Sequence, residues 1–117
     1  MSVRTDPDCL FCKIVAGEIP CTRLYEDDEV FAFADVNPQA PFHGLVVPKE
    51  HLATLDEFDD SQSGLAGRLM LVAKSLAAER DLPGYRVAMN VNSEGGQVIF
   101  HAHLHVLGGR QMTGSLG

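Results

Sequence analysis

The segment His101-Ala102-His103-Leu104-His105-Val106-Leu107 carries a histidine at every second position. Because side chains alternate between the two faces of a β-strand, a strand here places the three imidazoles on one face. The other face then carries the apolar residues Phe100, Ala102, Leu104 and Val106. A row of titratable rings backed by an apolar row favours a chemical role for the histidines over a packing role. The simpler alternative is a solvent-facing strand that carries histidines by coincidence.

The rest of the chain supplies the elements that pack with this strand. Apolar residues from Leu65 to Leu76 recur at steps of four, three and four, so they line one face of a long helix. We expect this helix to begin at a cap on Asp60 or Ser61 and to end at Asp81. A short helical turn is predicted over residues 11–16, and strands over residues 23–26, 30–34, 44–48, 85–90 and 98–107. Strands, one long helix and further strands predict an α+β fold, an antiparallel sheet with one long helix and a short N-terminal helix.

Composition bounds the class of protein. The 117 residues suit a single domain, 1–117, with a flexible N-terminal segment at 1–8 and a C-terminal tail at 113–117. Nine Lys and Arg against 16 Asp and Glu give a net charge of −7, which disfavours binding to nucleic acid. No apolar run reaches the ~20 residues that cross a bilayer. Because the first residues also lack an apolar signal-peptide core, we expect a cytoplasmic protein that does not bind membranes.

A histidine on such a face can serve as a metal ligand, a proton donor or a nucleophile. A nucleophilic imidazole needs a bare Nε2, so its Nδ1–H must donate to an acceptor such as a backbone carbonyl. Hydrogen-bond donors must also hold the charge that builds on the attacked atom. Asn90 and the run Gly95-Gly96-Gln97 supply candidates, because paired glycines let backbone N–H groups approach an anion closely. Taken alone, the glycine pair predicts only a turn.

The run from Gly95 to Met112, Gly-Gly-Gln-Val-Ile-Phe-His-Ala-His-Leu-His-Val-Leu-Gly-Gly-Arg-Gln-Met, resembles the histidine triad (HIT) superfamily. It is most similar to the HINT branch of nucleotide-binding phosphoramidases. The similarity extends upstream through Tyr25-Glu26-Asp27-Asp28, Asn37-Pro38-Gln39-Ala40-Pro41 and Val46-Val47-Pro48-Lys49-Glu50-His51. The resemblance covers nearly the whole chain, from Cys9 to Met112, and implies a HIT-like fold.

The resemblance also implies an enzyme that cleaves the P–N bond of purine nucleoside 5′-phosphoramidates, such as conjugates of AMP, and releases the nucleoside monophosphate. His103 would attack the α-phosphate and form a nucleotidyl-histidine intermediate that water hydrolyses. His105 would contact the phosphate oxygens and assist proton transfer, and His43 would support the triad through hydrogen bonds. Asp35 matches the acidic residue that accepts hydrogen bonds from the ribose hydroxyls. The phosphate would be held by Asn90, Gln97 and the backbone N–H groups of Gly96 and Val98.

The base-binding slot implied by the resemblance is apolar, which suits a flat purine. It consists of Leu10, Phe11, Ile14, Ile19, Phe33, Val36 and Leu45. Without the resemblance, all of these residues would be assigned to the core. Two departures from the HINT pattern concern the substrate site: Val98 stands where that branch commonly has serine, and the tail after Met112 lacks the tryptophan of animal relatives.

Cys9 and Cys12 form a Cys-x-x-Cys pair, and Cys21 stands alone. With His51 and His101, the pair makes a set of two thiols and two imidazoles, the ligand types that Zn²⁺ prefers. Many bacterial HIT proteins have this pattern as zinc ligands, so the resemblance implies a structural zinc that leaves His103 free. The alternatives are buried, reduced thiols or a redox dithiol, although the chain lacks the βαβ unit of a thioredoxin.

Other functions stay open beside the phosphoramidase. A zinc hydrolase with His101, His103 and His105 on one ion is disfavoured, because positions i and i+4 of a straight strand lie about 13 Å apart. A dinucleoside polyphosphate hydrolase and a nucleotide-binding regulatory module with little turnover fit the same motif. A homodimer is implied by the resemblance to the HINT branch. Neither the preferred base nor the leaving group follows from the sequence.

Overall fold

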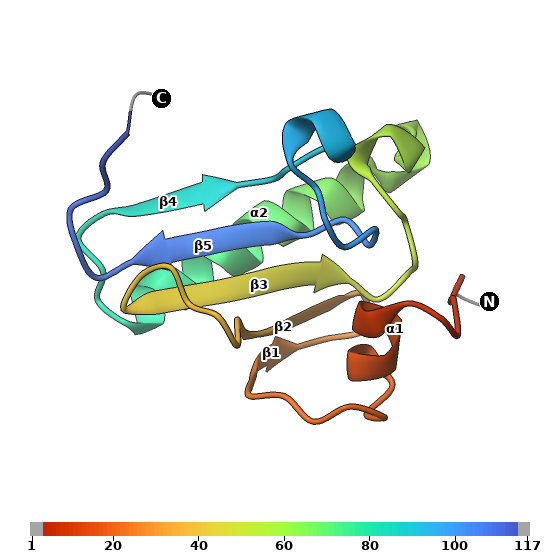
Figure 1. Ribbon diagram of the computed structural model, residues 1–117, viewed down its shortest axis with the longest axis horizontal. Coiled ribbons are helices and arrows are strands. Elements are labelled where there is room, and N and C mark those ends of the chain that lie inside the picture. Colours follow the sequence, from red (N-terminus) through yellow and green to blue (C-terminus); the bar gives the residue numbers. More distant parts are fainter. Residues whose placement is uncertain (1–3, 115–117) are drawn as a thin grey trace.

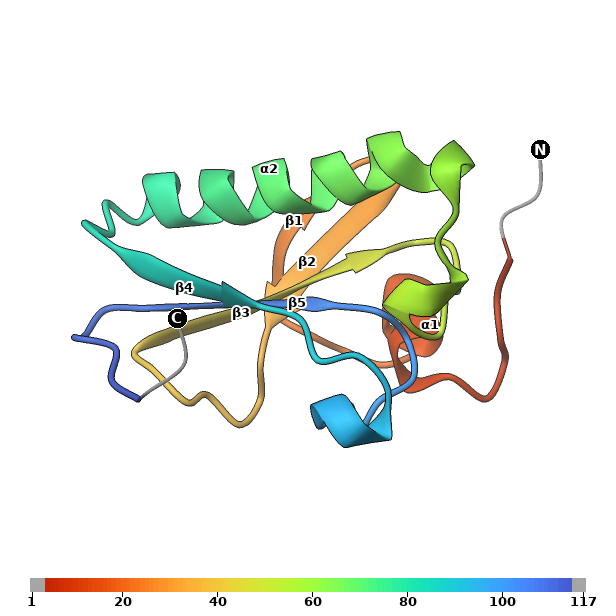
Figure 2. The same cartoon turned by 90° about the horizontal axis from the view of Figure 1, so that it is seen from above.

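The computed structural model describes residues 4–114, which form a five-stranded antiparallel sheet with a helix packed on each face (Figures 1 and 2). The strands are β1 (Arg23–Glu26), β2 (Val30–Ala34), β3 (Phe42–Pro48), β4 (Tyr85–Ala88) and β5 (Leu104–Gly108). Their spatial order is β1-β2-β3-β5-β4. The helices are α1 (Leu10–Val15) and α2 (Ser63–Glu79). This arrangement confirms the predicted α+β class with one long helix and a short N-terminal helix.

The sheet is apolar on both faces, because each face is covered by another element. On β2, Val30 and Ala32 join the cluster beneath α2, whereas Phe31 and Phe33 join the cluster beneath α1. This division follows the alternation of side chains along a strand. The helix α2 runs along one face of the sheet (Figure 2) and buries the predicted stripe, which includes Leu65, Leu69, Val72 and Leu76. The face opposite α2 is therefore the one on which α1 packs.

The helix α2 begins later than the sequence predicted. Residues Asp60–Gln62 form a 3₁₀ turn before it. The carboxylate of Asp59 accepts the N–H of Ser61 at 2.8 Å, and the side chain of Gln62 accepts the N–H of Asp59 at 2.7 Å. This capping box makes Asp59 the cap of the 3₁₀ turn that leads into α2, instead of Asp60 or Ser61.

The histidine strand is shorter than predicted, since β5 begins only at Leu104. The pairing of β5 with β3 stops at Leu104 and Val46, although β3 continues to Pro48, so residues 98–103 are not paired as a strand. Ala102 instead donates its N–H to the carbonyl of Leu52, in the loop after β3, at 2.8 Å. Phe100 turns outward and is 46% exposed, so it does not join the predicted apolar row.

At the start of the described chain, Arg4 contacts the loop that follows β3. The carbonyl of Arg4 accepts the N–H of His51 at 2.7 Å, and the Arg4 side chain lies 3.3 Å from that of Glu50. Residues 1–3 of the segment expected to be flexible, and residues 115–117 of the tail, lie outside the described residues. Between residues 4 and 114, no helix combines the length and apolarity needed to cross a bilayer.

Candidate active site and metal centre

A cavity of about 470 Å³ lies on the α1 side of the sheet, between α1, the ends of β2 and β3, and the loop that follows β4. His103 and His105 line it. Every residue expected to bind substrate lines it as well: Leu10, Phe11, Ile14, Ile19, Phe33, Asp35, Val36, Leu45, Asn90, Gly96, Gln97 and Val98. The fold thus brings segments that are distant in the sequence around two of the three triad histidines.

The apolar wall of this cavity is continuous with the core beneath α1. Phe11, Ile14, Phe33 and Leu45 belong to that buried cluster, so each both packs and lines the cavity. Val36, by contrast, is 88% exposed at the rim. A slot with rigid apolar walls and an open rim suits a flat aromatic ligand.

His103 is the most enclosed imidazole of the cavity, with 7% of its surface exposed. Its Nδ1 lies 2.7 Å from the backbone carbonyl oxygen of His101, so Nδ1 carries the hydrogen and Nε2 is bare. The ring of Phe11 packs against it nearly at right angles, with the two centroids 5.1 Å apart. Burial lowers the pKa of His103, partly opposed by the bond to His101 and by the charge of Asp35. A neutral imidazole with a bare Nε2 has the form that a nucleophile requires.

His105 lies beside His103, with the ring centroids 4.9 Å apart. On its other side, His105 Nδ1 is 2.9 Å from Nε2 of His43, which comes from the neighbouring strand β3. One hydrogen is therefore shared between these two rings. Burial, with the neighbouring His103 and His43, lowers the pKa of His105 to about 4, partly opposed by the charge of Asp35. Burial also lowers the pKa of His43, partly opposed by the charge of Asp35.

Asp35 follows β2 and lies between His43 and the cavity. Its Oδ1 accepts the N–H of Asn37 at 2.8 Å, and its Oδ2 is 3.4 Å from His43 Nε2. The side chain is 19% exposed and lines the cavity, and a carboxylate has about four lone-pair sites. Asp35 therefore keeps acceptor capacity for the hydroxyl groups of a ligand.

In the loop after β4, two of the residues expected at the phosphate donate hydrogen bonds within the protein. Gln97 is 4% exposed, and its side-chain amide donates to the carbonyls of Ala53 and Ile99 at 2.7 and 3.0 Å. The N–H of Gly96 donates to the carbonyl of Ser93 at 3.0 Å within a 3₁₀ turn. These donors have acceptors inside the protein and so shape the loop, and a phosphate-binding role for Gln97 and Gly96 stays a prediction.

Two other groups of the loop do face the cavity without such partners. Within residues 4–114, the N–H of Val98 donates no hydrogen bond, and its side chain is 85% exposed. Asn90, two residues beyond the end of β4, is exposed and lies against Gly96. Gly96 has a φ of +89°, which favours glycine at this turn. The Val98 N–H and the Asn90 amide are therefore the donors that the loop offers to an anion.

Cys9, Cys12, His51 and His101 form a second site at the end of the sheet, which we term the Cys–His cluster. Sγ of Cys9 and of Cys12 lie 3.4 and 3.5 Å from His101 Nδ1. Sγ of Cys12 lies 3.4 Å from His51 Nδ1, and the two Nδ1 atoms are 3.3 Å apart. Tetrahedral zinc with its usual bond lengths requires about 3.6 Å between sulfur and nitrogen and about 3.4 Å between nitrogens. The four ligand atoms therefore fit one zinc ion.

Neighbouring groups prepare the Cys–His cluster for a cation. His101 Nε2 is 2.7 Å from the carbonyl oxygen of Pro48, so Nε2 carries the hydrogen and Nδ1 is free to bind a metal. Burial raises the pKa of the Cys12 thiol to about 11, so a thiolate here needs a neighbouring cation. Cys21 is exposed and belongs to a different part of the chain.

The triad histidines do not form one metal site. Within residues 4–114, two groups hold their ligand atoms within 4.8 Å of one another: the Cys–His cluster, and Asp35 with His43 and His105. Neither group contains all three triad histidines, and His103 Nδ1 is bonded to a carbonyl. The alternative of a zinc hydrolase with all three on one ion does not fit this arrangement.

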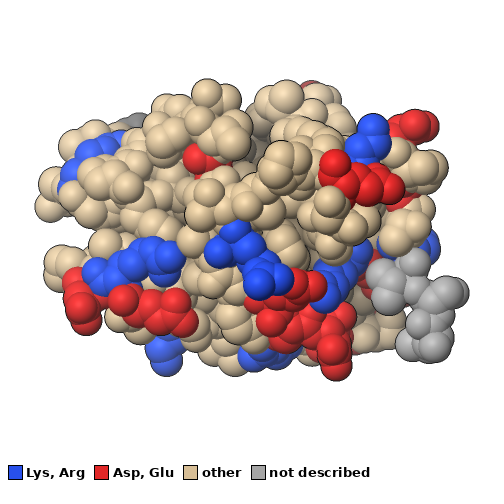
Figure 3. Space-filling view, turned by 90° about the horizontal axis from the view of Figure 1, so that it is seen from below, with Lys and Arg blue, Asp and Glu red and all other residues tan. Residues whose placement is uncertain are grey.

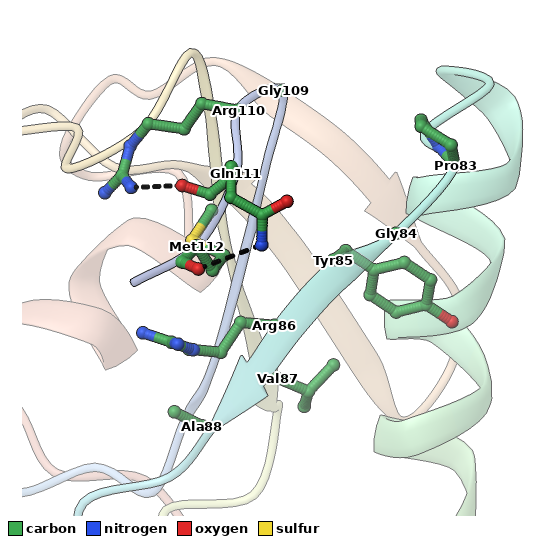
Figure 4. Close-up of a pocket in the computed structure, with 10 residues that line it drawn as sticks. All are labelled: Pro83, Gly84, Tyr85, Arg86, Val87, Ala88, Gly109, Arg110, Gln111 and Met112. Atoms are coloured by element: carbon green, nitrogen blue, oxygen red, sulfur yellow. Dashed lines mark hydrogen bonds between the residues drawn. The ribbon is translucent and has the colours of Figure 1, made fainter. Parts of the chain in front are cut away.

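A larger cavity, of about 1170 Å³, lies between β4 and residues 109–112 (Figure 4). It contains no triad histidine, and its two arginines donate to backbone carbonyls. Arg86 donates to Thr113, and Arg110 donates to Gln111, each at 3.1 Å. His103 and His105 therefore line the smaller of these two cavities.

On the face shown in Figure 3, most Lys and Arg side chains lie next to Asp and Glu side chains. The structure contains such ion pairs: Arg23 and Lys49 each contact Glu26, at 3.0 and 2.7 Å, and Arg68 contacts Asp27 at 2.6 Å. The rest of that face is largely uncharged. This face therefore presents no continuous basic surface to a nucleic-acid backbone.

Known proteins share both the sequence pattern and this architecture. The family model of the HIT domain matches residues 16–112. A HIT family hydrolase from Legionella pneumophila superposes with a TM-score of 0.88 at 52% identity, over 91% of this chain and 96% of that chain. A histidine triad protein from Clostridium difficile superposes with a TM-score of 0.92 at 42% identity, over 96% of this chain and 99% of that chain. The chain belongs to the HIT family and has the fold of its hydrolases.

The relatives found by sequence include a zinc-binding protein. The 14 kDa zinc-binding protein of Zea mays is 44% identical over 111 residues, covering 92% of this chain and 87% of that protein. An uncharacterized HIT-like protein of Synechococcus elongatus is 46% identical over 107 residues, covering 91% of this chain and 94% of that protein. The relative from maize and the geometry of the Cys–His cluster both support zinc binding.

Proposed function

We propose that this protein is a nucleotidyl hydrolase that cleaves the P–N bond of purine nucleoside 5′-phosphoramidates and releases the nucleoside monophosphate. The observation that carries the proposal is His103, a buried neutral imidazole that donates from Nδ1 to a carbonyl and keeps Nε2 bare. It lines a cavity of about 470 Å³, within the usual range for sites that bind small molecules.

In the first step, the Nε2 lone pair of His103 attacks the phosphorus atom. A bond forms between Nε2 and phosphorus, and the P–N bond of the substrate breaks. The leaving nitrogen, protonated in the reactive form of the phosphoramidate, keeps the bonding electron pair and departs as a neutral amine. The nucleotidyl-histidine is an imidazolium, whose Nδ1–H still donates to the carbonyl of His101.

In the second step, water attacks the phosphorus atom on the intermediate. The bond from phosphorus to Nε2 breaks, and its electron pair returns to Nε2 as a lone pair. The nucleoside monophosphate leaves, the water protons pass to the product phosphate and to solvent, and His103 is again neutral.

Donors around the cavity support both steps by holding the charged phosphate oxygens. The Val98 N–H, the Asn90 amide and His105 are the groups that face the phosphate position in this proposal. Asp35 accepts from the ribose hydroxyls, with its free acceptor capacity. The apolar walls formed by Ile14 and Phe33 enclose the base.

The zinc ion is structural in this proposal, held by the Cys–His cluster. When bound, zinc would neutralise the two thiolates and tie the start of α1 to His51 and to the segment that leads into β5. His101 also supplies the carbonyl that orients His103, so the cluster supports the nucleophile through the backbone. Neither chemical step passes through the metal.

A homodimer is a further part of the proposal, and it is supported by the edge of the sheet. Among residues 4–114, β4 pairs only with β5, so its other side is an edge of the described sheet. Tyr85 on β4 is 41% exposed, and Met70 and Leu71 on α2 are 52% and 54% exposed. Pairing with the same edge of a second copy would extend the sheet through a two-fold axis.

The decisive experiment combines kinetics with trapping of the intermediate. In the variant His103→Ala, release of AMP from adenosine 5′-phosphoramidate should fall by about 10³-fold or more, because the nucleophile is lost. Binding of AMP, measured by calorimetry, should persist. Mass spectrometry of acid-quenched wild-type protein should find the nucleotidyl group on the peptide that contains His103. An active His103→Ala variant would exclude covalent catalysis at this residue.

A panel of substrates separates the proposed reaction from the related one. Adenosine and guanosine phosphoramidates should be cleaved faster than diadenosine polyphosphates under the same conditions. The reverse order would assign the chain to the dinucleoside polyphosphate hydrolases of the same superfamily.

A further inference from the structure

Gln39 and Arg110 do not line the substrate cavity, yet hydrogen bonds connect both of them to His105. We infer that the backbone N–H of Gln39, held in place by Arg110, fixes the tautomer of His43 and thereby makes His105 a hydrogen-bond donor toward the cavity. Gln39 and Arg110 are then positioning residues. The effect on catalysis rests on the proposed function, whereas the tautomers do not.

The first point is which ring nitrogen of His43 carries the hydrogen. Its Nδ1 lies 3.0 Å from the backbone nitrogen of Gln39. A backbone amide nitrogen can only donate, so His43 Nδ1 is the acceptor and carries no hydrogen. The hydrogen of the neutral ring is therefore on Nε2. An imidazolium is disfavoured by the same contact, because it would place two N–H groups against each other.

The second point concerns the neighbouring ring of His105, to which this N–H group donates a hydrogen bond. The groups that face His43 Nε2 are His105 Nδ1 at 2.9 Å and Asp35 Oδ2 at 3.4 Å. His105 Nδ1 therefore accepts, and the hydrogen of neutral His105 is on Nε2. That nitrogen is the donor left for a phosphate oxygen. With Nδ1–H instead, His105 would turn a lone pair toward the phosphate and repel it.

The same assignment explains why this group is not a second metal site, although its ligand atoms lie close together. A metal on His43 Nε2 would require the hydrogen to move to Nδ1, which already faces the Gln39 N–H. The hydrogen bond from the Gln39 N–H therefore favours the tautomers in which His43 and His105 form hydrogen bonds and do not bind a metal.

The loop that carries Gln39 is held from outside the cavity by Arg110. Arg110 Nη2 donates to the carbonyl of Gln39 at 3.0 Å, and Nη1 donates to the carbonyl of Gln111 at 3.1 Å, as Figure 4 shows for the second bond. The guanidinium thus joins the loop before β3 to the segment after β5. Pro41 packs against Gly109, where an added Cβ would lie only 2.8 Å from the Pro41 Cβ. These contacts limit the movement of the Gln39 amide relative to His43.

The wild-type protein tests the inference without any substrate. Long-range ¹H–¹⁵N spectra of the histidine rings near pH 7.5 should show His43 and His105 as neutral rings with the hydrogen on Nε2. An Nδ1–H tautomer or an imidazolium at either residue would overturn the inference. A failure of the proposed function would leave these spectra unchanged, so the two failures are distinguishable.

A matched pair of variants tests the Gln39 N–H itself. Gln39→Pro removes the N–H, whereas Gln39→Ala removes only the side chain. Gln39→Pro should place hydrogen on Nδ1 of His43 and lower kcat for the phosphoramidate by about tenfold or more, with little change in KM. Gln39→Ala should match the wild type in both measurements. Wild-type tautomers in folded Gln39→Pro would contradict the inference.

Arg110 provides the second test, which also serves if Gln39→Pro does not fold. Arg110→Leu removes both bonds of the guanidinium, and Arg110→Lys keeps one cationic donor. Arg110→Leu should give a mixture of His43 tautomers and a loss of kcat of a few-fold, and Arg110→Lys should restore both in part. Wild-type tautomers and wild-type kcat in Arg110→Leu would show that Arg110 is not a positioning residue.

Discussion

Two pairs of histidines lie on the α1 side of the sheet, and they differ in what each pair can bind. His51 and His101 direct their Nδ1 atoms, 3.3 Å apart, toward two thiols. His43 and His105 approach to 2.9 Å and share a hydrogen. Both pairs are largely removed from solvent and are built from the same side chain, so residue type does not explain the difference.

The difference arises at the far nitrogen of one ring in each pair. His101 Nε2 faces the carbonyl of Pro48, an acceptor, so the hydrogen is drawn away and Nδ1 is left for a metal. His43 Nδ1 faces the N–H of Gln39, a donor, so the hydrogen is held between the two rings. A single backbone group, acceptor in one case and donor in the other, therefore separates a metal ligand from a hydrogen-bonding histidine.

The largest effect is expected from breaking the metal-binding pair. Cys12→Ser should reduce the zinc content from about one per chain to near zero and lower the free energy of unfolding by roughly 3 kcal/mol or more, because a hydroxyl cannot replace the thiolate. Elemental analysis and denaturant unfolding measure the two effects. Cys21→Ser, at an exposed thiol, is the matched control and should keep both values. Full zinc content in Cys12→Ser would refute this metal assignment.

A smaller effect is expected from the hydrogen-bonding pair. His105→Ala should lower kcat for a phosphoramidate by about 10²-fold, because the phosphate loses one donor in the transition state. His105→Gln, which keeps an N–H donor, should recover part of the loss. If His105 instead had to release a proton, glutamine would give no recovery, so steady-state kinetics of the two variants separate these roles.

The lowered pKa of His105 predicts how the free energy of unfolding depends on pH. The pKa of His105 is about 4 in the folded protein and ~6.5 in the unfolded chain, since burial disfavours the charged ring. Between these values the unfolded chain binds the extra proton, so the free energy of unfolding should be level above pH 6.5 and fall as the pH drops toward 4. Chemical denaturation at several pH values measures this slope. In His105→Gln the slope should be shallower, and an equal slope would contradict the assignment.

The smallest effect is expected at Val98, on the rim of the cavity. Val98→Ser adds a hydroxyl beside a free N–H and should lower KM by a few-fold, because it adds one donor for the phosphate. The side chain is 85% exposed, so the free energy of unfolding should change by less than ~0.5 kcal/mol. Calorimetric binding of AMP measures the same gain directly. A weaker affinity would place the phosphate away from this residue.

Side-chain patterns predicted most of the fold and much of the site. The stripe from Leu65 to Leu76 predicted α2, and the short apolar segments predicted the strands, because burial imposes a period that the residues must follow. The predicted strand over residues 98–107 was wrong before Leu104, where a loop forms. Alternation indicates where side chains point but not whether a partner strand is present.

Hydrogen bonds to backbone groups could not be predicted from side-chain patterns. The sequence did not indicate that the donors of Gln97 and Gly96, two residues expected at the phosphate, bond to the carbonyls of Ala53, Ile99 and Ser93. The N–H of Gln39 leaves no signal in the sequence, because every residue except proline has one. In the sequence, residues 37–41 contributed only to the resemblance to the HIT superfamily.

The types and spacing of residues were enough to determine the family, the α+β fold and the two sets of reactive side chains. That is so because imidazoles, thiols and apolar stripes are properties of the side chains themselves. Folding alone decided which ring nitrogen carries each hydrogen. Those assignments depend on whether a distant carbonyl or amide comes within about 3 Å, and such contacts exist only once Pro48, Gln39 and His101 are in their places in the folded chain.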